Sequence, residues 1–181
     1  AKAFESDTAV IRYNARGQGD SSLGDDEVSL ERHTHDLTEL LDEVDVDRAH
    51  LVGFSHGARI ACYTAASCPD RVSKLVLCSA TASDNALART TVRAWREALD
   101  AGGLEAMSWA SLPTILGNDF LEASEDMIDG IVRASIRRNS EQGVRALLDA
   151  LESYPPLEAF AQDVEAPTMV ISGDEDMLVT P

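Results

Sequence analysis

A serine between two glycines is the part of this sequence best suited to chemistry. Ser55 lies between Gly53 and Gly57, after a short apolar run and before small residues that tolerate a helix. A nucleophilic serine must stand clear of the backbone, and a tight strand-to-helix turn achieves this by straining the serine. We expect both glycines to be needed for close approach in this turn, so that a branched side chain at Gly57 would damage folding. The alternative is a turn without chemistry, since such short motifs recur by chance.

The elements around Ser55 fit such a turn. Residues Arg48–Phe54 are almost continuously apolar, which is typical of a strand covered on both faces. A helix over His56–Ser67 would direct its free N–H groups and positive dipole end at the serine. Pro69-Asp70-Arg71 ends that helix, and Lys74–Ser79 is typical of a second buried strand. Alternating strands and helices with short connections predict a parallel sheet in an α/β layer architecture.

The first fifty residues predict further parts of the same architecture. Thr8–Tyr13 is rich in β-formers and is expected to form a strand, followed by a loop over Asn14–Ser22. Arg16 and Asp20 of that loop could contact substrate, although such residues more often brace a loop by hydrogen bonds. Leucines and valines at helical spacing predict a helix from about residue 29 to 44.

From about residue 80 to 154 the strand pattern gives way to helical periodicity. Three or four amphipathic helices in this stretch indicate a helical cap inserted between two sheet strands. We therefore divide the chain into a core over 1–80, a cap over 81–154 and a resumed core over 155–181, where Thr168–Ser172 forms a strand. Some large side chains could line a pocket: Phe54, Trp95, Met107, Trp109 and Phe120. Each of them taken alone is more typical of a hydrophobic core.

Composition excludes several classes of partner. The chain has 32 acidic and 15 basic residues in 181, a formal charge of −17, which argues against binding nucleic acid or an anionic membrane. No apolar run reaches transmembrane length, and Ala1 opens without a signal-peptide pattern. Cys62, Cys68 and Cys78 lack metal-ligand spacing and are expected to be buried thiols of a cytoplasmic protein.

Four motifs in order make the chain resemble a capped α/β-hydrolase-fold protein, nearest to the esterase, 3-oxoadipate enol-lactonase and C–C hydrolase branches. The motifs cover residues 10–21 (VIRYNARGQGDS), 52–57 (VGFSHG), 71–77 (RVSKLVL) and 166–176 (APTMVISGDED). The resemblance implies an α/β fold with three layers, a mainly parallel sheet and a helical cap, and a reaction without metal or organic cofactor.

The resemblance also assigns roles to individual residues. Ser55 matches the nucleophile, and the backbone N–H of His56 matches one half of the oxyanion hole. Asp176 matches the acid of the catalytic triad, with Asp174 as its competitor. The family's triad histidine lies past the acid, so we expect it beyond Pro181, and the second oxyanion donor before Ala1. The chain is thus expected to be a fragment without esterase activity of its own.

None of the four histidines is expected to replace the triad base. His50 precedes Ser55 by five residues along a strand, about 16 Å at about 3.3 Å per residue. His56 is adjacent, but its side chain should run into the helix, where it could form part of a pocket wall. His33 and His35 are expected at the surface of a helix, or as capping residues.

The expected parent activity is hydrolysis of a small ester, lactone or related acyl or C–C bond through an acyl-serine intermediate. The same machinery serves acyltransferases and cofactor-free haloperoxidases, and a fold alone does not separate these reactions. A non-catalytic binding protein that kept the fold is the alternative from a different class. In each case the expected partner is a small molecule.

Overall fold

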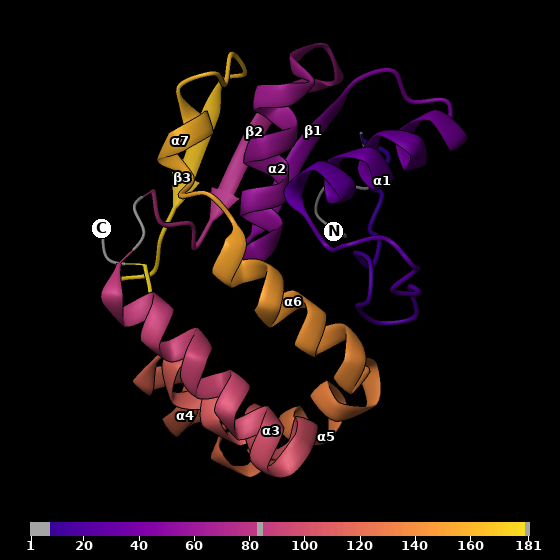
Figure 1. Ribbon diagram of the computed structural model, residues 1–181. Helices are drawn as coiled ribbons and strands as arrows, with labels where there is room; N and C mark the ends of the chain where they lie inside the picture. The colour runs from indigo at the N-terminus through magenta and orange to yellow at the C-terminus, as the bar shows by residue number, and fades with distance from the viewer. Residues whose placement is uncertain (1–7, 83–84, 180–181) are drawn as a thin grey trace.

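The computed structural model describes residues 8–82 and 85–179, which contain a three-stranded sheet, helices packed on it and a further group of helices (Figure 1). The elements in chain order are α1 (Leu30–Glu43), β1 (Ala49–Phe54), α2 (His56–Ser67), the 3-10 helix η1 (Pro69–Arg71), β2 (Val72–Cys78), α3 (Ala86–Ile115), α4 (Asn118–Ala123), the 3-10 helix η2 (Glu125–Met127), α5 (Ile128–Arg138), α6 (Glu141–Ser153), α7 (Glu158–Ala161) and β3 (Thr168–Ile171). The predicted helices and strands from residue 29 onward are confirmed, with α2 at its predicted bounds.

The sheet has the order β1-β2-β3, and both pairings are parallel. Phe54 pairs with Cys78, and Cys78 pairs with Ile171, so the strands end together at one edge. The carboxyl ends of parallel strands with helical connections are where loops gather to form ligand sites. Ser55 follows β1 at this edge, and its N–H donates to the Cys78 carbonyl at 2.8 Å.

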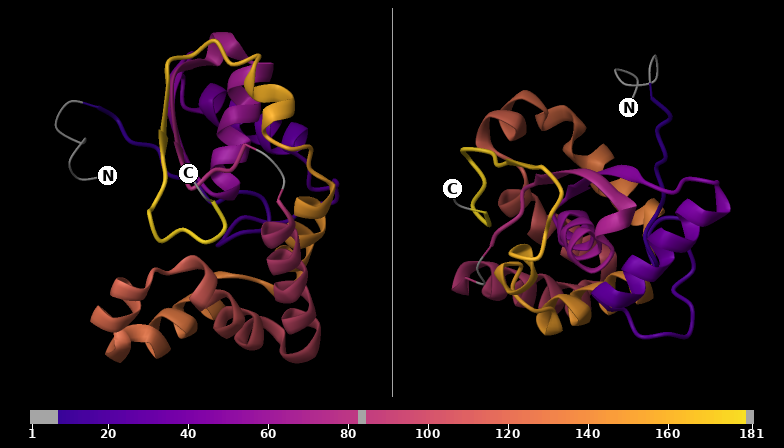
Figure 2. Two further views of the ribbon diagram at one scale, coloured as in Figure 1. Left: turned by 90° about the vertical axis from the view of Figure 1, so that its left-hand side faces the viewer. Right: turned by 90° about the horizontal axis from the view of Figure 1, so that it is seen from above.

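Helices cover one face of the sheet. Helix α2 packs on β1 and β2, and α1 and α7 pack against α2 (Figures 1 and 2). The buried side chains between these elements form the main core, with Leu30, Leu75 and Val72 almost completely removed from water.

The opposite face of the sheet is exposed in the described part of the chain. Val52 is 73% exposed and Val170 is 63% exposed. The prediction that β1 is covered on both faces is therefore wrong within the part of the chain that the structure describes. Alternate side chains of β1 point away from α2, toward a side where no described helix packs.

The strand predicted at Thr8–Tyr13 does not form. Its side chains are mostly exposed, and none of the strands in the described ranges pairs with this run. β-forming residues favour a pleated, half-buried surface, but a strand also needs a neighbour to complete its hydrogen-bond ladder.

The loop after this run is braced from inside. Arg16 donates to both carboxylate oxygens of Asp36, at 2.9 and 2.6 Å, and to the Leu23 carbonyl at 2.8 Å. The Arg16 side chain is only 11% exposed. Of the two roles considered for Arg16, the structure shows the bracing role, whereas Asp20 is exposed.

The helices α3–α6, here called the helical segment (residues 86–153), stand beyond the carboxyl-end edge of the sheet (Figure 1). Helix α3 packs against α5 and α6 and bends at Gly102 and Gly103, where Gly103 has φ 66°. This bend divides α3 into two helical parts. Leu99, Val144 and Leu148 form a second, smaller core there.

One part of the predicted packing in the helical segment is wrong. The helical spacing of Met127, Ile131 and Val132 predicts that they form one buried stripe; Val132 is buried, but Met127 is 57% exposed. Met127 is the last residue of η2, and α5 begins only at Ile128, so helical spacing does not extend to Met127.

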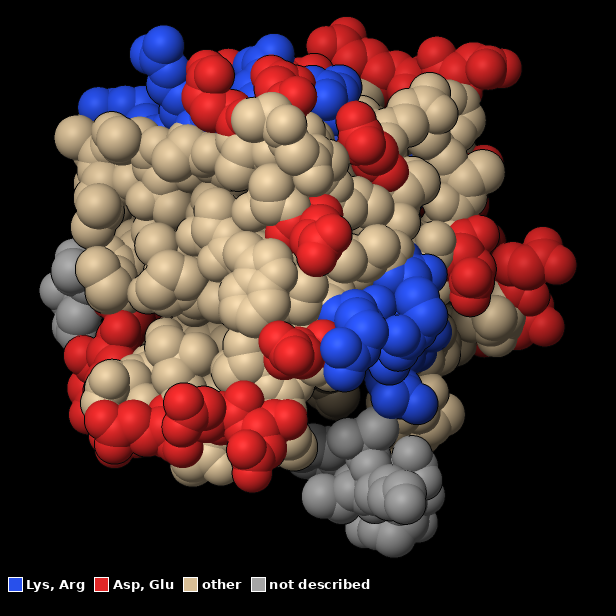
Figure 3. Space-filling view, turned by 90° about the horizontal axis from the view of Figure 1, so that it is seen from below, with Lys and Arg blue, Asp and Glu red and all other residues tan. Residues whose placement is uncertain are grey.

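The surface carries its charges in separate groups. Seen from the helical segment, acidic side chains occur in several groups around the rim and near the middle of the face, and basic side chains gather right of the centre and along the upper edge (Figure 3). None of the helices in the described ranges is long and apolar enough to span a membrane. All three cysteines are free, but only Cys62 is buried, and burial raises the pKa of its thiol to about 11.

Candidate active site

Ser55 has the strained backbone expected of it. Its φ of 52° and ψ of −115° lie outside the regions that L-residues ordinarily adopt. The residue is exposed at the turn between β1 and α2. Strain of this kind persists only where surrounding structure enforces it, and it is concentrated at functional sites.

The two glycines beside Ser55 are not equivalent. A Cβ on Gly53 would lie 2.2 Å from the Gly57 carbonyl oxygen and 2.6 Å from the Ala58 Cα. Helix α2 can therefore lie this close to β1 only because residue 53 has no side chain. A Cβ on Gly57 would meet nothing within 4 Å. The expectation that Gly57 has no room for a side chain is therefore wrong, because its Cα faces open space beside the turn.

Helix α2 begins directly at the serine. The N–H groups of Ala58 and Arg59 donate to the Ser55 carbonyl at 2.9 and 3.3 Å. As the first residue of the helix, His56 has an N–H without an acceptor in its own helix. This N–H lies next to the serine and at the positive end of the helix dipole, where an oxyanion is stabilised.

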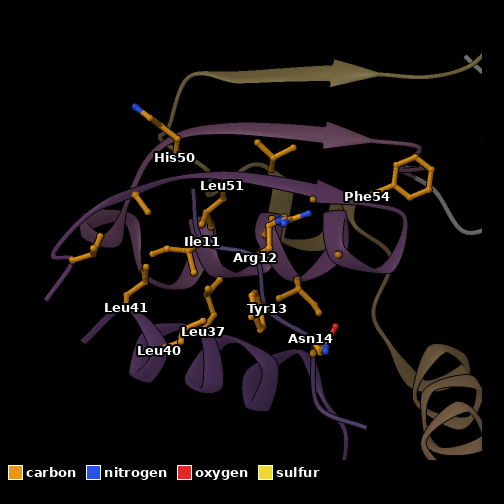
Figure 4. A pocket seen from close by; sticks show the side chains of 18 of the residues that line it. Ile11, Arg12, Tyr13, Asn14, Leu37, Leu40, Leu41, His50, Leu51 and Phe54 are labelled. Atoms are coloured by element: carbon orange, nitrogen blue, oxygen red, sulfur yellow. The ribbon is translucent and has the colours of Figure 1, made fainter. Parts of the chain in front are cut away.

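Two hollows meet at Ser55. The first, here called the Ser55 pocket, has a volume of about 570 Å³ and lies between α2, the end of β2, the helical segment and residues 178–179. The second, here called the β1 trough, has a volume of about 710 Å³ and runs between residues 8–15, α1 and β1 (Figure 4). Ser55 and His56 line both hollows.

The Ser55 pocket is basic, although the chain as a whole is strongly acidic. Arg59 of α2 and Arg89 and Arg93 of α3 line it. The acidic residue in its lining, Glu152, accepts a hydrogen bond from Arg96 at 3.2 Å. The pocket wall therefore favours a ligand with negative charge.

A polar network fixes the side chain of His56. Its Nδ1 lies 3.4 Å from the Gln18 amide nitrogen, and its Nε2 lies 3.3 Å from the Tyr154 hydroxyl. The His56 and Tyr154 rings are stacked, and the His33 ring meets His56 edge-on at 5.0 Å. Burial, with the neighbouring His33 and Arg59 charges as lesser causes, lowers the pKa of His56 to about 3. His56 is thus a neutral pocket-wall residue at neutral pH.

The four histidines of the chain lie in different surroundings. No hydrogen bond in the described ranges joins one of them to Ser55. His33 is 2% exposed, so its expected surface position is wrong, because the side of α1 that carries it packs against α2. His35 is exposed and pairs with Glu39 at 3.1 Å. His50 lies at the end of β1 remote from Ser55 (Figure 4).

Asp176 follows β3 in a tight turn. The N–H groups of Leu178 and Val179 donate to its Oδ1 at 3.0 and 2.9 Å, which fixes the carboxylate. Asp176 lies in a smaller hollow that it shares with Ser79 and the exposed Asp174. Ser79 also lines the Ser55 pocket, so the hollow of Asp176 adjoins the Ser55 pocket at the end of β2.

Comparison with known proteins identifies the family. A family model described as the alpha/beta hydrolase fold matches residues 1–181. The chain belongs to the alpha/beta hydrolase fold family. The predicted fold class, an α/β-hydrolase fold with a parallel sheet, is thereby confirmed, and the described ranges contain two of its three expected layers.

Individual members of this family are similar over most of the chain. A Bacillus subtilis (strain 168) protein named as a 2-succinyl-6-hydroxy-2,4-cyclohexadiene-1-carboxylate synthase is 30% identical, over 94% of this chain and 65% of its own length. The 3-oxoadipate enol-lactonase 1 of Acinetobacter baylyi is 26% identical, over 98% of this chain and 65% of its own. This chain thus spans 65% of the length of these curated relatives.

A solved structure shows the same arrangement of elements. The enol-lactonase from Burkholderia xenovorans LB400 superposes with a TM-score of 0.83 at 25% identity, covering 99% of this chain and 68% of that chain. Because this alignment covers 99% of this chain, it includes the helical segment at the Ser55 end of the sheet.

The large side chains predicted to line a pocket in this alpha/beta hydrolase are divided by the structure. Trp95 lines the Ser55 pocket, and Phe54 lines the β1 trough. Met107 packs against the second core, Trp109 is 45% exposed, and Phe120 lines the hollow of Asp176. Only the first two therefore share a hollow with Ser55.

Six residues of the site were not singled out by sequence reasoning: Arg59, Arg89, Arg93, Tyr154, Gln18 and Ser79. Arg59 lies four residues after Ser55, which places it one helical turn further along α2. Ser79 has φ 50°, a second strained residue at the same sheet edge. Nothing in the local sequence marks Tyr154 or Gln18.

The lowered pKa of His56 predicts an acid-sensitive component of stability. In the unfolded chain His56 has its ordinary pKa of 6.5 and is protonated below that pH. In the folded chain its pKa is about 3, so between these two values only the unfolded chain carries the extra proton. The free energy of unfolding should therefore fall with decreasing pH in this window, by up to about 1.4 kcal/mol per pH unit. We expect His56→Gln to flatten this slope in denaturant titrations between pH 6.5 and 4, and His35→Gln to leave it unchanged. Equal slopes for both variants would contradict the burial of a neutral His56.

Proposed function

We propose that Ser55 is the nucleophile of a hydrolase that cleaves a small ester or lactone through an acyl-serine intermediate. The observation that supports this most is the combination of a strained, exposed serine with a helix N-terminus directly behind it. Both features are required of a nucleophile that must be reached by a base and a carbonyl group at once.

The reaction would proceed in two steps. The Ser55 Oγ attacks the carbonyl carbon while a base takes its proton, and the resulting oxyanion accepts a hydrogen bond from the His56 N–H. The leaving alcohol takes the proton from the base and departs, which leaves the acyl group on Ser55. Water then repeats the sequence, and the acid product and free serine are formed.

In this proposal the base is a residue other than the four histidines of this chain, in keeping with the expectation from the family resemblance. Asp176 is proposed as the carboxylate that orients it, because two backbone N–H groups already fix one of its oxygens. The proposed substrate is a soluble small molecule, and a cytoplasmic location is proposed with it.

The charge of the Ser55 pocket supports a substrate that carries a carboxylate. Arg59, Arg89 and Arg93 gather there in a chain with a formal charge of −17. The names of two relatives also contain carboxylates, one as a synthase of a cyclohexadiene carboxylate and the other as a 3-oxoadipate enol-lactonase. Electrostatic complementarity of this kind raises the local concentration of an anionic substrate.

A pair of esters with equal acyl length tests this substrate class. In the product of the complete gene we expect p-nitrophenyl hydrogen glutarate to be hydrolysed with a higher kcat/KM than p-nitrophenyl valerate. Arg93→Gln should reduce this preference about 2- to 5-fold, because an exposed ion pair contributes up to about 1 kcal/mol. Added salt should reduce it as well.

The matched control is Arg133→Gln, which removes an exposed arginine of α5 that does not line the pocket. It should leave the preference unchanged. An equal or greater rate with the neutral ester would contradict the carboxylate class. Absence of turnover with either ester, together with reversible binding, would support the non-catalytic alternative.

A further inference from the structure

The polar network around His56 links three segments that are far apart in the sequence. Gln18 belongs to the loop braced by Arg16, His56 begins α2, and Tyr154 follows α6 at the end of the helical segment. His56 and Tyr154 both line the Ser55 pocket. The network therefore connects the residue next to the proposed nucleophile with a hydroxyl group in the pocket wall.

The hydrogen bonds of this network have a defined direction. The structure places the Gln18 amide with its nitrogen toward His56 Nδ1, and because that nitrogen can only donate, this placement assigns Nδ1 the acceptor role. A neutral imidazole then carries its proton on Nε2, which donates to the Tyr154 hydroxyl oxygen. The Tyr154 oxygen is the acceptor in this contact, and its own hydrogen remains to be donated elsewhere.

The surroundings keep this direction constant. Burial lowers the pKa of His56 to about 3 and raises the pKa of the Tyr154 hydroxyl, so both groups keep their protons as described at neutral pH. Gln18 is held by its own backbone, which donates to the Ala15 carbonyl at 2.9 Å and forms an antiparallel bridge with Asn139. In the described ranges, His56 is the hydrogen-bond partner recorded for the Tyr154 hydroxyl.

We propose that the Tyr154 hydroxyl donates a hydrogen bond to the substrate in the Ser55 pocket, and that His56 is the positioning residue that keeps it a donor. This inference rests on the proposed function, since it names a contact to the substrate of the same site. The group recognised is an oxygen acceptor of the acyl compound, a carbonyl or carboxylate oxygen. Arg59 lines the pocket beside this hydroxyl and donates to the Pro155 carbonyl at 3.2 Å, next in sequence to Tyr154.

One substitution reverses the network with minimal change of shape. Gln18→Glu places an acceptor opposite His56 Nδ1, which moves the imidazole proton to Nδ1. His56 Nε2 then becomes an acceptor, and the Tyr154 hydroxyl must donate to it instead of to a ligand. Tyr154→Phe removes the same donor directly and leaves the stacked ring in place.

The measurement uses the 181-residue chain with Ser55→Ala, which prevents turnover, and Trp109→Phe, which leaves Trp95 of the pocket as the single indole. The probe is monomethyl glutarate, titrated at pH 8 and followed by Trp95 fluorescence. We expect Tyr154→Phe and Gln18→Glu each to weaken binding about 3- to 10-fold, as loss of one hydrogen bond does. The double variant should bind no more weakly than Tyr154→Phe alone, because both changes remove the same donor.

Two further observations make the test decisive. Gln162→Glu adds the same charge at an exposed position and should leave binding unchanged. Nitrogen NMR of the histidine rings should show the Nε2–H tautomer of His56 in the parent chain and the Nδ1–H tautomer in Gln18→Glu. Unchanged binding in either single variant, additive effects in the double variant, or an Nδ1–H parent would overturn this inference while leaving the proposed hydrolase intact. Failure of the parent to bind the probe would overturn this inference together with the proposed carboxylate class of substrate, whereas the Ser55 nucleophile is tested by turnover and labelling.

Discussion

Ser55→Ala in the product of the complete gene is expected to lower ester turnover by about 10⁴- to 10⁶-fold, the usual effect of removing a catalytic serine. The folded state should be almost unaffected, because the Ser55 side chain is exposed and the positive φ is imposed by the backbone on both sides. Initial rates with a chromogenic ester, together with thermal unfolding, measure both effects.

The matched control is Ser67→Ala, at the other end of α2, where the serine is exposed and remote from the pocket. This variant should retain full turnover. A Ser55→Ala variant with more than about a hundredth of the parental rate would exclude the nucleophile role, since binding and oxyanion contacts alone leave far less.

Gly53→Ala is expected to destabilise the protein by about 3 kcal/mol, at the upper end of the range for overpacking. The new methyl group would lie 2.2 Å from a backbone oxygen of α2, which cannot rotate out of the way. Either β1 or the start of α2 must shift, and the turn at Ser55 shifts with it. Urea unfolding of the 181-residue chain measures the loss.

Gly57→Ala provides the contrasting case at the other side of the same serine. Its methyl group meets open space, and alanine is favoured over glycine in a helix by about 1 kcal/mol. We therefore expect equal or slightly greater stability. A loss as large as that of Gly53→Ala would mean that the turn, rather than the close approach of α2, requires both glycines.

The sequence predicts the elements near Ser55 because their local signals agree with their packing. The apolar run of β1 and the glycine at position 53 leave little freedom, and α2 occupies its predicted bounds. The identity of Ser55 as the candidate nucleophile and its strained backbone follow from the same few residues. Asp176 was found only through the family resemblance, and its role stays a prediction; the structure adds that two backbone N–H groups fix its carboxylate.

Features that depend on distant contacts were not predictable in this way. His33 is buried because α1 packs on α2, and Thr8–Tyr13 lacks a strand because no described strand pairs with it. The walls of the Ser55 pocket come from α2, α3 and the end of α6, so Arg93 and Tyr154 line the same pocket only after folding. The network through His56 likewise joins residues separated by 38 and 98 positions.

Mapping the site of a serine-directed fluorophosphonate tests the central claim most directly. The reagent forms a covalent bond only with an activated serine, so digestion and mass spectrometry of the labelled complete gene product identify the nucleophile itself. We predict a single adduct, on the peptide that contains Ser55, and no adduct in the Ser55→Ala variant. An adduct on another serine, or unchanged labelling after Ser55→Ala, would contradict the assignment of Ser55 as the nucleophile.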